Sequence, residues 1–166
     1  KSCVDSKNIQ AEPTHHISYS QYKAAGGYAL LTACMTGQRD VESVIQEVET
    51  SGLRGLGGAG FGAGRKWRIL KTQKHHRLMV INLDEGEPGT FKDRTLLETD
   101  PHRFLEGMLI AAWVVEATDV YIYMRDEYPD VIKFLREEIK KIEDANLNIK
   151  TRIHRKVFKT RHSSKA

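Results

Sequence analysis

The alternation of strand and helix patterns between residues 77 and 145 is the feature that most constrains the fold of this chain. Residues 77–83 (RLMVINL) and 119–124 (DVYIYM) are short runs rich in β-branched and aromatic side chains, as in buried strands. Apolar residues recur at helical spacing in two later segments, 101–116 and 129–145, and each begins with a proline, which favours a first helical turn. The order strand, helix, strand, helix predicts an α/β fold, a sheet with flanking helices and parallel pairing.

Two further helices are expected before the first strand. Residues 19–35 show near-helical spacing of apolar side chains, which Gly26-Gly27 interrupt. A second helix is expected to begin after Asp40, a good N-cap residue, and to stop at Gly52. The region before the first strand is therefore predicted to be helical.

Charge is distributed unevenly along the 166 residues. The net charge is +4, but residues 150–166 alone carry seven Lys and Arg and no acid, so the rest of the chain is mildly acidic. We expect a flexible arm over residues 1–17, one domain over 18–149 and a basic, disordered tail over 150–166. The tail leaves open a nucleic-acid-binding role, although it offers one aromatic residue and no recognisable fold, so nucleic acid is not the favoured partner.

Several classes of function are disfavoured by composition. An iron–sulfur cluster normally needs about four cysteine ligands, and the chain has only Cys3 and Cys34. The longest apolar run, residues 104–115, is too short to span a bilayer. No signal peptide is visible, which predicts a cytoplasmic protein. Histidine pairs at 15–16 and 75–76 lack partners at ligand spacing, so no metal site is expected.

The glycine-rich segment, residues 51–67 (SGLRGLGGAGFGAGRKW), holds seven glycines. Gly55, Gly57 and Gly60 satisfy G-x-G-x-x-G, but a helix is expected before them where the dinucleotide fingerprint requires a strand. A Walker A loop is excluded because no Ser or Thr follows Lys66. Two interpretations remain open: a structural connection, or a loop whose backbone lines a cofactor, with Lys66 as the counter-charge of a phosphate.

The acidic segment, residues 82–87 (NLDEGE), begins in the last two residues of the first predicted strand and continues directly after it. It places Asn82, Asp84, Glu85 and Glu87 at a carboxyl end, where open α/β sheets bind ligands. Clustered carboxylates repel one another, which favours a partner that offers hydroxyl or amide donors. A solvated acidic turn is the alternative.

These two motifs in this order resemble the flavoprotein subunit of respiratory complex I, which binds flavin mononucleotide (FMN) and NADH, and its relatives in NAD-dependent formate dehydrogenases and hydrogenases. The family patterns are G-R-G-G-A-G-F-P-T-G-x-K-W and N-x-D-E-G-E-P-G-T-F-K-D-R. The similarity continues through DPHRFLEGMLIAA and YIYMRDEY, covers roughly residues 43–149, and leans towards the formate dehydrogenase branch. It implies a non-classical Rossmann-like FMN-binding domain that passes hydride between NAD(H) and FMN.

The resemblance also implies which residues hold FMN. Backbone contacts would come from glycines of the glycine-rich segment, a cationic contact from a lysine, and contacts to the ribityl chain or ring edge from the acidic segment. In chain order these residues are Gly55, Gly57, Gly58, Lys66, Asn82 and Asp84.

For the second nucleotide, the resemblance implies that Phe61 stacks on the adenine of NADH and that Glu85 and Glu87 line the nicotinamide side. The flavin would perform the hydride chemistry, so no side chain is expected to act as an acid or base. Ile69 stands where a second aromatic residue is expected.

This chain departs from the family in the loop and after the domain. Leu56, Gly62 and Ala63 replace Arg, Pro and Thr, which predicts a looser loop and weaker flavin affinity. Beyond residue 149 the family continues into a second half with the cysteines of an iron–sulfur cluster, which this chain does not encode. We therefore expect a domain incomplete at its C-terminal side, partner subunits that carry the clusters, and no catalysis by the chain alone. A non-catalytic scaffold that mediates subunit interaction is the alternative.

Overall fold

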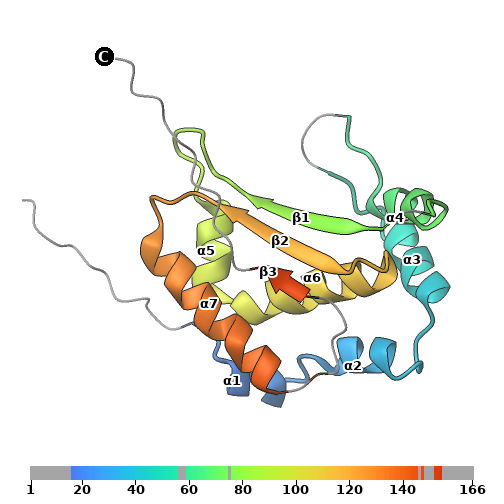
Figure 1. Ribbon diagram of the computed structural model, residues 1–166, viewed down its shortest axis with the longest axis horizontal. Coiled ribbons are helices and arrows are strands. Elements are labelled where there is room, and N and C mark those ends of the chain that lie inside the picture. The colour runs from blue at the N-terminus through green and yellow to red at the C-terminus, as the bar shows by residue number, and fades with distance from the viewer. Residues whose placement is uncertain (1–15, 56–58, 75, 146, 148–151, 155–166) are drawn as a thin grey trace, which may run out of the picture.

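The computed structural model describes residues 16–55, 59–74, 76–145, 147 and 152–154, and every structural statement below refers to these residues (Figure 1). From β1 onwards, helices alternate along the chain with the strands of a parallel sheet, as the sequence predicts. The elements are α1 (Tyr19–Ala24), α2 (Ala29–Met35), α3 (Val41–Thr50), α4 (Ala63–Lys71), β1 (Leu78–Leu83), α5 (Lys92–Thr99), α6 (Pro101–Val114), β2 (Asp119–Met124), α7 (Pro129–Asp144) and β3 (Arg152–His154).

The sheet has the strand order β1-β2-β3, and both pairings are parallel. Leu78 of β1 pairs with Asp119 of β2, and the register continues to Leu83 opposite Met124. The predicted parallel pairing is confirmed. Residues 152–154, which the sequence analysis assigned to a basic tail, instead form β3, because their backbone pairs with the first half of β2.

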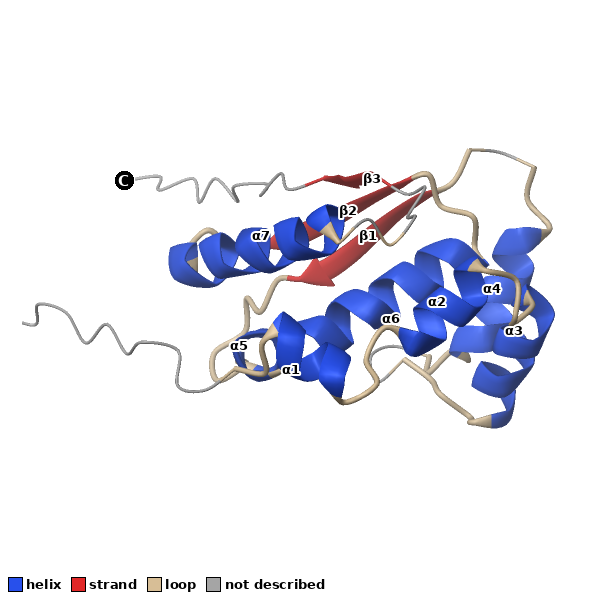
Figure 2. Cartoon of the chain, turned by 90° about the horizontal axis from the view of Figure 1, so that it is seen from below, coloured by secondary structure: helices blue, strands red, loops and turns tan. Residues whose placement is uncertain are grey.

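One face of the sheet carries the core. Val120, Ile122 and Met124 of β2 are buried, whereas Leu78 and Val80 of β1 are 57% and 64% exposed on the opposite face. Figure 2 shows the reason: the sheet forms one layer, and α6 with the N-terminal helices forms another on one side of it. Side chains alternate along a strand, so covering one face buries every second residue.

The helix expected over residues 19–35 is divided into α1 and α2. Gly26 and Tyr28 both have positive φ, 92° and 63°, so the chain turns sharply between the two helices. The cost of the left-handed conformation at Tyr28 is offset by burial of its side chain, which is only 2% exposed. The predicted interruption at Gly26-Gly27 is thus a full helix break.

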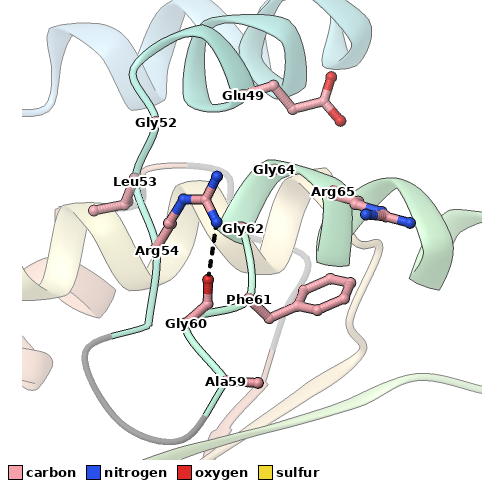
Figure 3. A pocket seen from close by; sticks show the side chains of 10 residues that line it. All are labelled: Glu49, Gly52, Leu53, Arg54, Ala59, Gly60, Phe61, Gly62, Gly64 and Arg65. Carbon is pink, nitrogen blue, oxygen red and sulfur yellow. Dashed lines mark hydrogen bonds between the residues drawn. The ribbon is translucent and has the colours of Figure 1, made fainter.

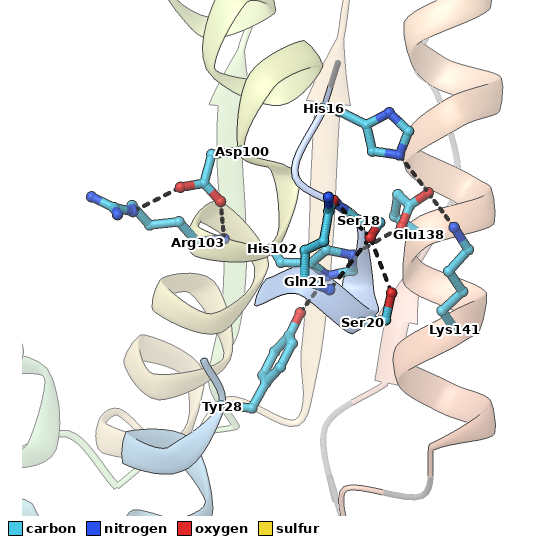
Figure 4. Close-up of polar contacts among 10 residues, drawn as sticks. All are labelled: His16, Ser18, Ser20, Gln21, Tyr28, Asp100, His102, Arg103, Glu138 and Lys141. Atoms are coloured by element: carbon cyan, nitrogen blue, oxygen red, sulfur yellow. Dashed lines mark hydrogen bonds and ion pairs between the residues drawn. The ribbon is translucent and has the colours of Figure 1, made fainter. Parts of the chain in front are cut away.

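A buried polar network links Tyr28, the N-cap residue of α2, to α6 and α7. His102 of α6 has no exposed surface and lies between the Tyr28 hydroxyl, 2.7 Å from Nδ1, and the Glu138 carboxylate, 2.9 Å from Nε2 (Figure 4). Lys141 Nζ donates to the second Glu138 oxygen over 2.6 Å. Buried polar groups need such partners, so the network fixes the relative positions of three helices.

Candidate functional site

The glycine-rich segment leaves α3 at Thr50 and folds back on itself before α4. Arg54 and Gly62 form an antiparallel bridge, Gly55 N donates to the Phe61 carbonyl over 3.1 Å, and Ala63 N donates to the Leu53 carbonyl over 2.9 Å. This hairpin-like loop is followed directly by α4, a helix that the sequence analysis did not predict. The close spacing of glycines masked the short apolar pattern of α4.

A pocket of about 450 Å³ opens beside this loop (Figure 3). Backbone of four glycines forms much of its wall, and two arginines and an aromatic ring stand around it. Its lining residues are Glu49, Gly52, Leu53, Arg54, Ala59, Gly60, Phe61, Gly62, Gly64 and Arg65. Exposed backbone beside arginines is a combination suited to an anionic ligand.

The arginines and the ring of this pocket are held by contacts within the loop. Arg54 Nη1 lies 3.4 Å from the Gly60 carbonyl oxygen, and the Arg65 guanidinium lies 5.5 Å from the centroid of the Phe61 ring. Phe61 itself is 47% exposed, so its ring is available for stacking. Arg54 and Arg65 were not among the predicted site residues, since Arg54 precedes the family pattern and Arg65 stands at its unspecified position.

Predicted loop residues are placed as follows. Gly55 lies in the hairpin, whereas Gly57 and Gly58 lie outside the described residues. Lys66 is exposed in the first turn of α4, and its backbone N donates to the Gly62 carbonyl over 3.0 Å. The N-cap of α4 is Gly62, which offers no side-chain hydrogen bond to the first turn. Because Ala63 N already donates to the Leu53 carbonyl, the helix-start amides left for an external acceptor are those of Gly64 and Arg65, which line the pocket.

The acidic segment turns sharply after β1. Asn82 Oδ1 accepts from Asp84 N over 3.0 Å, and the Glu87 carbonyl accepts from Thr90 N over 3.2 Å. The side chains of Asn82, Asp84 and Glu87 are exposed. Their oxygens are thus accessible to a ligand that offers hydroxyl or amide donors.

Glu85 differs from its neighbours because it is buried, with 4% exposure. Its two carboxylate oxygens accept from the backbone N of Asp93, over 2.8 Å, and of Arg94, over 3.2 Å. These amides belong to the first turn of α5, so Glu85 satisfies donors that a helix leaves open at its start. The structure gives this carboxylate a structural contact that the sequence analysis did not predict.

The two predicted motifs do not line one pocket in the described part of the chain. Figure 1 places α4 beside the beginning of β1, whereas the acidic segment lies at its end, and residues 82–87 are not among those that line the loop pocket. The loop pocket and the acidic segment therefore offer two separate groups of contacts along one edge strand.

Arg125 follows β2 and is a further residue that sequence reasoning missed. Its guanidinium donates to the backbone carbonyl of Glu85 and forms an ion pair with Glu127, with Nη2 and Oε1 3.1 Å apart. The Arg125 guanidinium lowers the pKa of Glu127 to about 2, and the Glu127 carboxylate in turn raises the pKa of Arg125. The carboxyl ends of β1 and β2 lie side by side, which brings Arg125 next to the acidic segment. A prediction of the strand register would have been enough to place Arg125 there.

Across the described ranges, no group of three or more His, Cys, Asp or Glu side chains is arranged to hold a metal ion, and no helix has the length and apolar character needed to cross a membrane.

Comparison with known proteins places this site in a family. Residues 48–162 match the Nuo51 FMN-binding domain model. The chain is 42% identical over 122 residues to a subunit of the NADH-quinone oxidoreductase of Aquifex aeolicus, and the match covers 74% of this chain and 28% of the relative. With the corresponding protein of Escherichia coli K12, identity is 39% over 129 residues, covering 76% and 29%.

Among solved structures, the crystal structure of an NAD+-reducing NiFe hydrogenase in the H2-reduced state is similar, with a TM-score of 0.63 and 37% identity. The match covers 69% of this chain and 20% of the hydrogenase chain. The chain thus shares its open parallel sheet with flanking helices with this structural relative. It belongs to the Nuo51 FMN-binding domain family, and it spans less than a third of the length of these relatives.

Proposed function

We propose that this chain contributes the first part of an FMN site and an adjoining NAD(H) site in a flavoprotein subunit of a larger oxidoreductase assembly. The observation that carries the proposal is the pairing of the loop pocket, with its arginines and open helix start, with exposed oxygen acceptors at the end of β1. The loop pocket suits a phosphate, and the exposed oxygen acceptors at the end of β1 suit hydroxyl groups. Membership in the FMN-binding family supports FMN as the molecule that offers both.

For FMN we propose that the phosphate end lies at the glycine-rich segment, beside Gly55, Gly57, Gly58 and Lys66. The ribityl hydroxyls would donate to Asn82 and Asp84, whose side chains are exposed. When bound, FMN supplies hydride acceptance and donation. The chain's own residues bind and orient it.

For NAD(H) we propose that Phe61 stacks on the adenine, because its ring is 47% exposed beside the pocket. Glu87, which is exposed, is the glutamate that a nicotinamide ring can contact. Glu85, buried at the start of α5, would serve this side by holding the segment in place. Ile69 is also exposed, at 47%, but offers no aromatic face, which predicts weaker nucleotide stacking.

The remaining parts of the proposal concern the whole assembly. The relatives that are NADH-quinone oxidoreductase subunits support NADH oxidation as the reaction, and a formate dehydrogenase is the finer alternative within the same chemistry. Further polypeptide would complete the flavin site, and partner subunits would carry electrons onward. The alternative is a non-catalytic scaffold that mediates subunit interaction.

FMN titration of the purified chain tests this proposal, with flavin fluorescence as the readout and riboflavin as the control ligand. We expect saturable binding that prefers FMN. Lys66→Ala should weaken FMN by about 1.5–3 kcal/mol, the range for a hydrogen bond to a charged group, and should leave riboflavin affinity unchanged. Lys140→Ala, at an exposed lysine of α7, is the matched control. A folded chain that binds no FMN would favour the scaffold.

A further inference from the structure

The acidic segment is held in place by a set of short contacts. The Glu85 carboxylate accepts from two amides of α5, Asn82 accepts from Asp84 N, and the Glu87 carbonyl accepts from Thr90 N. These contacts fix the backbone from within its own loop and the helix that follows. The side chains of Asp84 and Glu87 are exposed.

Arg125 adds a contact from the neighbouring strand. Since Leu83 pairs with Met124, the residues that follow these two lie side by side at the carboxyl edge of the sheet. Arg125 Nη1 donates to the carbonyl oxygen of Glu85, and its side chain is only 24% exposed. The carbonyl of Glu85 therefore has a charged donor, which makes a stronger hydrogen bond than a neutral one.

The orientation of Arg125 is itself fixed. Nε and Nη2 lie 3.3 and 3.1 Å from the two carboxylate oxygens of Glu127, and the guanidinium lies 5.7 Å from the centroid of the Tyr128 ring. The guanidinium of Arg94, in α5, lies 5.1 Å from the same ring centroid. The Tyr128 ring thus lies near two guanidinium groups, one from α5 and one from the residue after β2. A guanidinium within about 6 Å of a ring centroid is attracted to the ring.

We propose that Arg125 is a positioning residue for the acidic segment, and that it sets the FMN affinity of Asn82 and Asp84 without contacting the cofactor. The inference rests on the proposed function, because it assigns Arg125 a role in that same site. Each nitrogen of its guanidinium group donates to a protein acceptor, and the acceptor in the acidic segment is the Glu85 carbonyl.

Two variants of the full chain test the proposal. Arg125→Gln removes the charge and the forked geometry, and we expect its FMN dissociation constant to rise about ten-fold, because FMN must then order a segment that Arg125 no longer holds. Arg125→Lys keeps the charge and should recover part of this loss. Arg39→Gln is the control, because Arg39 forms an ion pair with Glu47 in the α2–α3 region, and its FMN affinity should match the unsubstituted chain.

Amide hydrogen exchange supplies a readout that does not need FMN. The backbone amides of Asp84, Thr90, Asp93 and Arg94 donate within the segment. Arg125→Gln should speed exchange at these four amides and leave α3 unchanged.

The outcomes separate the two proposals. Unchanged FMN affinity in a folded Arg125→Gln chain, with or without a lower unfolding midpoint, overturns the positioning role. If the unsubstituted chain binds no FMN, the proposed function fails, and amide exchange alone tests the positioning role. Faster exchange at the four amides in Arg125→Gln then supports positioning of the segment, and unchanged exchange refutes it.

Discussion

Replacing Glu85 by Ala separates a structural carboxylate from a ligand-binding one. The side chain is buried and accepts from two amides at the start of α5. Loss of a helix cap costs about 1 kcal/mol, and loss of a negative charge at a helix N-terminus costs about 0.3–1 kcal/mol more. Because burial shields these contacts from solvent, we expect Glu85→Ala to lower the free energy of unfolding by about 2 kcal/mol.

Urea unfolding followed by circular dichroism measures this change, with Glu87→Ala as the matched control. Glu87 is the exposed glutamate of the same segment, and its carbonyl contact to Thr90 survives the substitution. The control should change stability by less than about 0.5 kcal/mol. If Glu85→Ala unfolds like the unsubstituted chain while NADH affinity falls, Glu85 is a ligand contact and the capping argument is refuted.

Three further predictions concern the helices. Burial lowers the pKa of His102 even though the Glu138 carboxylate opposes this shift, so the unfolded chain takes up the proton first. The stability that neutral His102 contributes should be present above about pH 6.5 and be lost as the pH falls below it. If the free energy of unfolding of His102→Asn depends on pH in the same way as that of the unsubstituted chain, this prediction is contradicted. Gly64→Ala should destabilise by about 1–3 kcal/mol, because the added Cβ would lie 2.5 Å from Glu49 Cγ and 2.8 Å from Glu49 N. Gly107→Ala should instead raise the free energy of unfolding by about 0.5–1 kcal/mol, because the added Cβ on α6 would meet nothing within 4 Å. Thermal unfolding of both variants tests these two predictions, and a change opposite to the expected one would contradict the reasoning for that glycine.

Elements with strong local signals were predicted well. β2 has the predicted bounds, β1 begins one residue late, and α6 and α7 begin at the predicted prolines. Two short helices, α4 and α5, were missed, because glycines precede one and charged residues dominate the other. In α5 the start is stabilised by the Glu85 carboxylate, which approaches through the fold and leaves no pattern in the sequence of the helix itself.

Local sequence by itself determined the alternation of strands and helices, the parallel sheet and the two motifs that identify the family. These follow from periodicity and from residue types that act over a few positions. Only the tertiary structure decided that α6 and the N-terminal helices lie on one side of the sheet, that Glu85 is buried while Glu87 is exposed, and that Arg125 reaches the Glu85 carbonyl. The physical reason is that these contacts join residues far apart in the chain, where strand register and helix packing, rather than local propensity, set the distances.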